Sequence, residues 1–269
     1  MKITYLGTAA AEGFPAVFCH CSHCLEARRL GGKNIRTRSQ ALINDDLLID
    51  LPADSYAHFL QNGIEADKIA YLLVTHAHSD HLYPKELAMR GGAFAHNMRT
   101  PRLQVVGTEV TRETIGTVAA AVDVRALAPY EKVTLGEYEI TPLPAKHMGT
   151  GAAFIYIIKG DKTLLYAHDT GYFYAEVFDY IEREGIVLDM VSLDCTNVDI
   201  PISDEGYHMG FPNIERVLAR LETMGAVTER TVRYVNHFSH NGGPLQHHLE
   251  ERARAYGCLV SYDGCRVEF

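Results

Sequence analysis

Residues 71–81 read YLLVTHAHSDH, the most informative stretch of the sequence. An apolar, strand-like segment runs directly into three histidines and one aspartate within six positions. Imidazole and carboxylate ligands together suit zinc, manganese or iron, and a catalytic site must leave a coordination position open for water. This loop offers more ligands than one catalytic zinc usually takes from a single segment, which indicates two adjacent ions. The alternative is a polar loop that happens to be rich in histidine.

The spacing of these residues resembles the HxHxDH signature of the metallo-β-lactamase superfamily of binuclear metal hydrolases. The resemblance implies that His76 and His78 bind one metal ion, while Asp80 and His81 bind the other. It also implies the fold of that superfamily, a four-layer αββα sandwich of the α/β class. The hydrophobic pattern alone also allows another α/β sandwich.

The superfamily takes three further ligands from downstream segments, and each has a matching candidate at a strand end. By resemblance, His147 in PAKHMG completes the first metal site, and Asp169 in YAHDTG bridges the two sites. His237 in YVNH completes the second site. The alternative for each is a hydrogen-bonded residue that caps a strand. His168 is a rival ligand beside Asp169, but strand alternation points it to the opposite face, so we expect a core or supporting role.

A second group of metal-ligand side chains lies near the N-terminus, where Cys19, Cys21 and Cys24 place three thiols within six residues. Thiolates this close together, in a chain without a recognisable signal peptide, favour a structural zinc over disulfides. Three thiolates leave one position of a tetrahedral site unfilled. His20 and His23 are rivals for that position, although their chelate geometry would be strained. Reduced thiols without a metal are the alternative.

Residues 6–8 (LGT), residues 13–15 (GFP) and the CxCxxC pattern together resemble the phosphodiesterase subgroup of the superfamily. That subgroup is typified by the phosphoribosyl 1,2-cyclic phosphate phosphodiesterases of carbon–phosphorus bond cleavage. Its fourth zinc ligand is a histidine three residues after the last catalytic ligand, which implies His240 here. One short loop would then connect the structural zinc with the catalytic centre.

Three further residues are candidates for supporting or catalytic roles. Asp50 and Asp194 each end an apolar strand, where a carboxylate can orient metal-binding imidazoles or serve only as a turn residue. His208 lies in GYHMG and resembles the GHM-type segment whose histidine protonates the leaving oxygen in the phosphodiesterase branch. An imidazole can do so because it titrates near neutral pH. Tyr207 stands where that motif often has glycine, and the alternative for His208 is a residue near a helix N-terminus without a catalytic task.

The chain has 269 residues and a formal net charge of −9. We expect one domain over residues 1–269, because no linker, repeat or low-complexity tract divides the sequence. It contains no apolar stretch of about 20 residues that could span a bilayer, so we expect a cytoplasmic protein without a membrane partner. The acidic balance argues against a broad surface for long nucleic acids. The oligomeric state stays open, a homodimer included.

Strand-like apolar runs recur between helix-like segments, which indicates two packed sheets with helices outside. The predicted strands are 3–6, 40–43, 47–50, 70–74, 103–106, 132–135, 138–142, 153–158, 163–167, 188–194, 232–236 and 259–262. The predicted helices are 53–61, 84–90, 111–120, 173–184, 213–224 and 244–256. The SYDG turn between Cys258 and Cys265 would let these two free thiols face each other across a hairpin.

These patterns and resemblances predict a metal-dependent phosphodiesterase with two divalent ions, manganese or zinc, and one structural zinc. The expected substrate is a small cyclic or nucleotide-like phosphate ester. The subgroup implies 5-phosphoribosyl 1,2-cyclic phosphate, with 2′,3′-cyclic nucleotides as further substrates. Asp80 would orient the attacking hydroxide while it binds metal, and His208 would protonate the leaving oxygen. One alternative is a transfer-RNA 3′-processing endonuclease, although the sequence lacks the inserted basic arm of that family. Another is a non-catalytic, metal-dependent binding protein.

Overall fold

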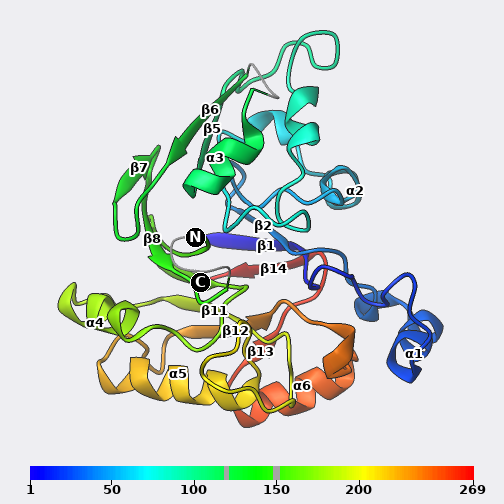
Figure 1. Cartoon of the computed structure of the whole chain (residues 1–269), viewed down its shortest axis with the longest axis vertical. Coiled ribbons are helices and arrows are strands. Elements are labelled where there is room, and N and C mark those ends of the chain that lie inside the picture. The colour runs from blue at the N-terminus through cyan, green and yellow to red at the C-terminus, as the bar shows by residue number, and fades with distance from the viewer. Residues whose placement is uncertain (118–120, 148–151) are drawn as a thin grey trace.

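The computed structural model describes residues 1–117, 121–147 and 152–269. Two β-sheets pack face to face, and helices cover the outer face of each sheet (Figure 1). This succession of layers confirms the predicted four-layer αββα sandwich.

Each sheet contains seven strands. The strands of the first sheet are β1 (Lys2–Gly7), β2 (Gln40–Ile43), β3 (Leu47–Ile49), β4 (Tyr71–Leu73), β5 (Leu103–Gly107), β6 (Val122–Ala126) and β14 (Cys265–Glu268). Those of the second sheet are β7 (Val133–Leu135), β8 (Tyr138–Pro144), β9 (Phe154–Lys159), β10 (Thr163–Ala167), β11 (Met190–Asp194), β12 (Val232–Asn236) and β13 (Leu259–Val260).

The helices are α1 (Ser22–Leu30), α2 (Ser55–Asn62), α3 (Glu109–Ile115), α4 (Ala175–Arg183), α5 (Phe211–Thr223) and α6 (Gln246–Ala255). Short 3₁₀ helices are η1 (Gly32–Asn34), η2 (Ala66–Lys68), η3 (Pro84–Met89) and η4 (His240–Gly242). No helix within the described ranges combines the length and the apolar character needed to cross a membrane.

Each sheet is antiparallel on one side and parallel on the other. The first sheet has the order β14-β1-β2-β3-β4-β5-β6, and β3 to β6 run parallel. The second has the order β13-β12-β11-β10-β9-β8-β7, and β10 to β13 run parallel. The carboxyl ends of the parallel strands within each sheet therefore lie along one edge, where loops can bring side chains together.

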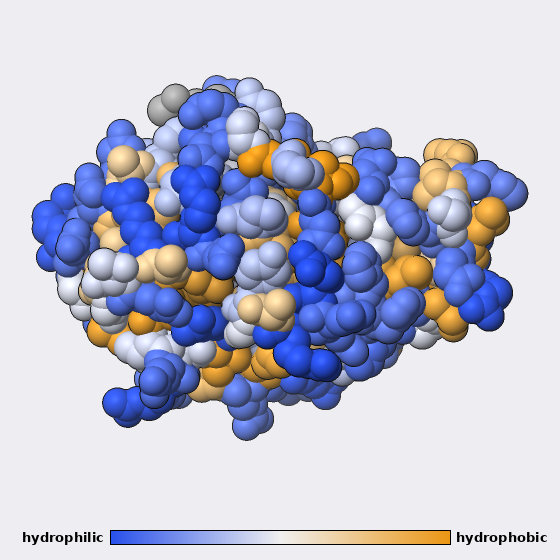
Figure 2. All heavy atoms as spheres, turned by 90° about the horizontal axis from the view of Figure 1, so that it is seen from below, coloured by the Kyte–Doolittle hydropathy of each residue, from blue (hydrophilic) through white to orange (hydrophobic). Residues whose placement is uncertain are grey.

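The core follows from strands that are apolar on both faces. On β9, Phe154, Tyr156 and Ile158 lie in the cluster between the sheets, while Ile155 and Ile157 lie in the cluster beneath the helices. Side chains alternate between faces along a strand, so a continuous apolar run is buried on both sides. Helices α4, α5 and α6 cover the second sheet, and α2 and α3 cover the first. The outward face of the α5 and α6 layer is largely hydrophilic (Figure 2).

The structure differs from the sequence-based elements at several places. Helix α1 was not predicted because it is largely polar. Strands β6 and β14 were not predicted because each is short, and its apolar–charged alternation contains too few apolar residues to mark a strand. The predicted helix over 84–90 is the 3₁₀ helix η3. Helix α3 ends at Ile115, and the last three residues of the helix predicted over 111–120 lie outside the described residues.

The predicted hairpin between Cys258 and Cys265 is wrong. Strand β13 belongs to the second sheet and pairs with β12, whereas β14 belongs to the first sheet and pairs with β1. The SYDG segment crosses from one sheet to the other, because the open edge of β1 offers β14 an antiparallel partner. Both thiols are free and buried.

Arg36 is a buried cation that connects segments far apart in the sequence. Only 2% of its surface is exposed. Its guanidinium donates to Thr8 Oγ1 at 2.8 Å, to the Ser261 carbonyl at 2.9 Å and to Gln246 Oε1 at 2.5 Å. It also lies 4.5 Å from the centre of the Phe238 ring. Burial lowers the pKa of Arg36 to about 10, which leaves the group protonated near neutral pH.

Substitution Arg36→Ala should lower the free energy of unfolding by about 3–5 kcal/mol, the range expected when a buried charge network loses one member. The loss leaves Gln246 and the nearby carboxylate of Asp263 without their cation. Urea unfolding followed by circular dichroism measures the change. The exposed control Arg230→Ala should shift stability by no more than about 0.5 kcal/mol. Equal stability of both variants would refute this role for Arg36.

Candidate active site

The candidate site lies where strands of both sheets end. Asp50 and His76 follow β3 and β4 of the first sheet. Asp169, Asp194 and His237 stand at the ends of β10, β11 and β12 of the second sheet. Because β3 pairs parallel with β4, and β10 to β12 also run parallel, these ends meet at one side of the sandwich.

Three of these residues have a left-handed backbone. The φ angle is 64° at Asp50, 52° at Asp169 and 64° at His237. A non-glycine residue in this conformation costs of the order of 1–3 kcal/mol, so surrounding contacts must hold it. Each strand thus ends in a tight turn at a residue that faces the site.

The first cluster contains His76, His78 and His147, whose ligand atoms lie within 4.8 Å of one another. His78 Nδ1 lies 2.9 Å from His76 Nε2 and 3.1 Å from His147 Nε2. Burial lowers the pKa values of His76 and His147. Neutral imidazoles are the form that binds metal, so the cluster is suited to a cation.

The second cluster contains Asp80, His81, Asp169 and His237, again with ligand atoms within 4.8 Å of one another. Asp169 Oδ2 lies 2.5 Å from His81 Nε2 and 3.1 Å from His237 Nε2. All three atoms are buried and lack a hydrogen-bond partner. Buried polar atoms are normally satisfied, so three such atoms at one point fit a bound metal ion.

Asp169 belongs to the second cluster and also lies close to the first. Its Oδ2 is 3.7 Å from His76 Nε2, and its Oδ1 is 3.8 Å from His147 Nδ1. Burial would raise the pKa of Asp169, but His237 and His81 outweigh it and hold the pKa well below its usual range. An ionised carboxylate at this position can contact ions in both clusters.

Asp50 orients the ring of His81 through the nitrogen that does not face Asp169. His81 Nδ1 donates to Asp50 Oδ2 at 2.7 Å, which leaves Nε2 facing Asp169. The backbone N–H and the hydroxyl of Thr75 also donate to Asp50. A carboxylate that holds the second nitrogen of a histidine sets its orientation and tautomer. The geometry agrees with the orienting role predicted for Asp50.

Asp194 is fully buried and holds the neighbouring turns of the site together. It accepts hydrogen bonds from the backbone N–H groups of Asp169, Thr196 and Met209, each at 3.0 Å. The hydroxyl of Thr196 lies 2.8 Å from His237 Nδ1. Asp194 therefore supports two candidate ligand turns without lying in the first or second cluster.

His208 reaches the site from the loop before α5. Its Nδ1 lies 3.2 Å from Asp194 Oδ2 and 3.3 Å from Asp169 Oδ1, and its ring stacks on His237 at 13°. Burial would lower the pKa of His208, but the carboxylates of Asp194 and Asp169 outweigh it and raise the pKa to about 9. Both carboxylate contacts use Nδ1, so Nε2 remains for a bound molecule.

His168 is not part of either cluster. It is fully buried, and its Nε2 lies 2.7 Å from Ser192 Oγ while its Nδ1 lies 3.1 Å from Asn236 Nδ2. Tyr5, on a strand of the opposite sheet, also bonds Ser192 at 2.7 Å. His168 thus belongs to a polar network between the sheets, as strand alternation predicts.

A pocket of about 370 Å³ opens above both clusters. Its walls include candidate ligands, His208 and five polar residues that the sequence did not single out: Glu12, Thr196, Asn197, Ser239 and Asn241. Glu12 comes from the loop after β1, and the others come from loops after β11 and β12. The sequence offered one signal for these residues: Glu12 lies between LGT and GFP, and the other four shortly follow Asp194 or His237 at the ends of β11 and β12.

The cysteine cluster lies on the segment that projects with α1 (Figure 1). Cys19, Cys21, Cys24 and His240 each offer a ligand atom, and these atoms lie within 4.8 Å of one another. His240 Nδ1 is 3.8 Å from Cys21 Sγ and 3.7 Å from Cys24 Sγ. Contact with His240 and with the Cys24 backbone lowers the pKa of Cys21 to about 6. A thiolate donor set of this kind fits tetrahedral zinc.

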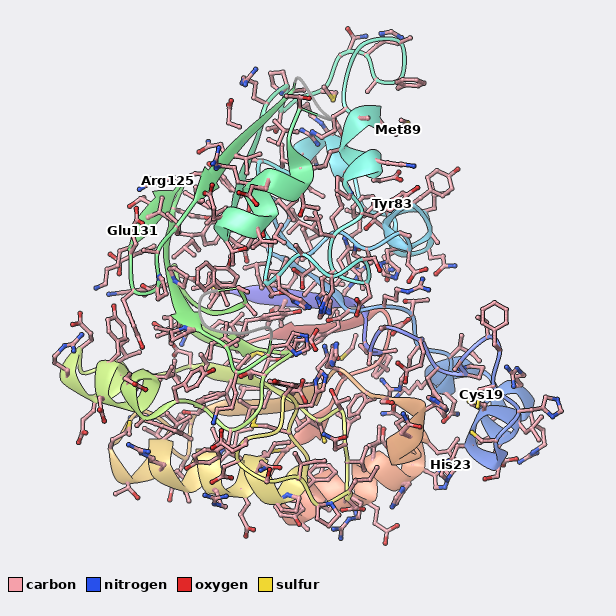
Figure 3. The ribbon with its side chains drawn as sticks, in the orientation of Figure 1. Cys19, His23, Tyr83, Met89, Arg125 and Glu131 are labelled. Atoms are coloured by element: carbon pink, nitrogen blue, oxygen red, sulfur yellow. The ribbon has the colours of Figure 1, made fainter. Side chains whose placement is uncertain are left out.

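The two rival histidines lie outside this cluster. His20 and His23 are both exposed, and Figure 3 shows His23 apart from Cys19 on the same projecting segment. The His23 ring lies against Gly243, where an added Cβ would come within 2.7 Å of the ring. The structure brings His240, and neither rival, to the three cysteines.

Sequence comparison assigns the chain to a known family. A model of the beta-lactamase superfamily domain matches residues 47–234, which contain the HxHxDH motif, His147 and Asp169. The chain belongs to the beta-lactamase superfamily. An octanoyltransferase of Porphyromonas gingivalis (strain ATCC BAA-308 / W83) is 36% identical over 86 residues. That match covers 30% of this chain, and the chain spans 16% of the length of that curated relative.

Solved structures of the same superfamily fold align with this chain over its length. A diphosphatase from the PhnP family is 22% identical with a TM-score of 0.74, and the alignment covers 100% of this chain and 97% of the other. Zn²⁺-bound PqqB from Methylobacterium extorquens is 18% identical with a TM-score of 0.75, with 100% of both chains covered. The short form of human tRNase Z is 15% identical with a TM-score of 0.66, with 100% and 99% covered. At these identities the likeness concerns the fold.

The fold of the superfamily implies divalent ions, and two matched substitutions should separate the clusters. Asp169→Asn should reduce the content of catalytic metal by about two ions, because its carboxylate lies between both groups of histidines. Cys21→Ser should remove one zinc and leave the other ions bound. Elemental analysis of dialysed, folded protein counts the ions. Retention of two tightly held ions by Asp169→Asn would contradict the bridging position.

Proposed function

We propose that this member of the superfamily is a binuclear metal-dependent phosphodiesterase that hydrolyses a small cyclic or nucleotide-like phosphate ester. One observation carries the proposal. Asp169 lies between two clusters of metal-ligand side chains, and His208 stands 3.3 Å from its Oδ1 at the pocket. The fold shared with a PhnP-family diphosphatase and with tRNase Z supports a phosphate ester as substrate.

The donor atoms fit divalent ions such as manganese or zinc, because imidazole and carboxylate ligands suit both. The residues that would hold them are His76, His78 and His147 for one ion, Asp80, His81 and His237 for the other, and Asp169 for both. Such ions supply positive charge near a phosphoryl oxygen and lower the pKa of water. The four residues of the cysteine cluster would hold a structural zinc.

Asp80 would orient the attacking water. Its carboxylate lines the pocket and lies 3.4 Å from His81 Nε2. Burial opposes ionisation, but His81 lowers the pKa of Asp80 well below its usual range. The group therefore stays ionised and can accept a hydrogen bond from water, which fixes the direction in which the oxygen lone pair points.

His208 would act as the general acid. Asp194 accepts a hydrogen bond from His208 Nδ1 and stabilises the protonated ring, so Nε2 carries a proton toward the pocket. Transfer of that proton neutralises the departing alkoxide. A cyclic phosphate needs less of this assistance, because ring strain already favours cleavage.

Substitution His208→Ala should slow hydrolysis of an unactivated alkyl diester by about 10²–10⁴-fold, the usual contribution of a general acid. It should slow a p-nitrophenyl diester much less, since that leaving group departs without a proton. Steady-state kcat for both substrates measures the difference. The neighbouring exposed residue offers a matched control, Tyr207→Phe, which should change both rates equally. Equal losses on both esters in His208→Ala would remove the acid role.

Phosphorus NMR tests the reaction itself. Manganese-loaded protein should open the ring of 5-phosphoribosyl 1,2-cyclic phosphate or of a 2′,3′-cyclic nucleotide. Cleavage of a precursor transfer RNA without turnover of these small esters would favour a transfer-RNA 3′-processing endonuclease. Metal binding without turnover of any of them would favour a non-catalytic binding protein.

A further inference from the structure

One wall of the pocket is formed by residues 10–12 together with Ser239 and Asn241. We propose that this pocket selects phosphodiesters whose remaining part is uncharged and rich in hydroxyl groups. Glu12 is the residue that rejects a second phosphate. This inference rests on the proposed phosphodiesterase activity and specifies its substrate class.

Glu12 is held in place beside the pocket. Its Oε1 accepts hydrogen bonds from Ser239 Oγ at 2.6 Å and from the His240 backbone N–H at 3.2 Å. The side chain of Glu12 remains 31% exposed, and these bonds do not use Oε2. Glu12 therefore presents a fixed negative charge to any group on this side of the pocket.

The pocket also offers neutral hydrogen-bonding groups. Asn197, Ser239 and Asn241 also line the pocket, and Asn241 Nδ2 donates to Ser239 Oγ at 3.2 Å. Amides and hydroxyls can donate to or accept from a sugar hydroxyl, and a carboxylate accepts from one. This wall suits the hydroxyl groups of a sugar or polyol.

No lysine or arginine lines the pocket among the residues that the structure describes. Arg38 contacts the wall from outside, Lys146 directly precedes the lining residue His147, and both cations are already engaged. Arg38 Nε donates to the carbonyl of Ala11 at 2.9 Å, and its NH1 pairs with Asp54 at 3.1 Å. Lys146 Nζ donates to the carbonyl of Asp204 at 2.8 Å.

A phosphate monoester carries about −1.5 to −2 charge near neutral pH. Beside Glu12 such a group would face a carboxylate, with no lysine or arginine in the described pocket walls to offset its charge, after losing part of its hydration.

The negative charge of Glu12 discriminates between the two substrates that the subgroup resemblance suggests. The compound 5-phosphoribosyl 1,2-cyclic phosphate carries a second phosphate, whereas a 2′,3′-cyclic nucleoside phosphate presents a hydroxyl at the corresponding end. The pocket favours the second kind. Its order of preference is therefore the reverse of the one that the resemblance alone implies.

A matched pair of substrates tests the inference. Adenosine 2′,3′-cyclic phosphate and its 5′-phosphorylated derivative differ only in the second phosphate. Wild-type protein should prefer the first by about tenfold or more in kcat/KM, the order expected from one fixed charge at a partly solvated separation. Glu12→Gln removes the negative charge and should therefore reduce that ratio by about tenfold. The local structure should persist, because the amide oxygen can still accept hydrogen bonds from Ser239 and His240.

The control and a second measurement make the result specific. Glu113→Gln removes an exposed carboxylate from α3, away from the pocket, and should leave the ratio unchanged. Inhibition of aryl diester hydrolysis by adenosine 3′-phosphate and by adenosine 3′,5′-bisphosphate should show the same discrimination and the same response to Glu12→Gln. Zinc content equal to that of the wild type would show that the His240 loop is intact in the variant.

The outcomes distinguish this inference from the activity on which it rests. Turnover of both cyclic substrates with equal kcat/KM, or with preference for the 5′-phosphorylated one, would overturn the inference and leave the phosphodiesterase assignment standing. A ratio that Glu12→Gln does not change would overturn the role of Glu12. Absence of turnover on every diester, in folded protein that holds its metal ions, would overturn both.

Discussion

One buried carboxylate constrains the whole site. Nitrogen atoms of five histidines lie within 3.8 Å of the Asp169 oxygens, and they belong to His76, His81, His147, His208 and His237. A buried charge is costly unless groups of opposite sign surround it. The first sheet supplies two of these histidines, and the strands and loops of the second sheet supply the rest with Asp169 itself. The two sheets must therefore stack with their strand ends in register, and the site exists only in the assembled sandwich.

The loop from His237 to His240 transmits this constraint to the cysteine cluster. Its first residue lies against Asp169, and its last lies among the three cysteines. Between them, Phe238 is fully buried under the guanidinium of Arg36. Glu12 also contacts this loop, because its carboxylate accepts a hydrogen bond from Ser239. The candidate pocket, the wall that carries Glu12 and the cysteine cluster thus share one short segment, and a shift in any of them would move the others.

Sequence reasoning reached most of the fold and the outline of the site, for identifiable reasons. The HxHxDH spacing is local, so it can be read directly from 71–81. His147, Asp169 and His237 required a family resemblance, because nothing near them in the sequence indicates which strands become neighbours. The structure brings all three to the first motif. Glu12 was missed because its contact with Ser239 spans 227 positions. Strand β14 was missed because its pairing with β1, rather than its own composition, makes it a strand.

The pairing of β1 with β14 has a consequence for synthesis on the ribosome. Strand β1 is made long before β14, so it acquires its second neighbour only when residues 265–268 have left the exit tunnel. The cysteines of the N-terminal segment likewise wait for His240. Until then a nascent chain of more than two hundred residues carries an unpaired strand edge and three available thiols. Unpaired edges invite association with other chains, so β1 is open to such contacts during synthesis until residues 265–268 emerge to cover it.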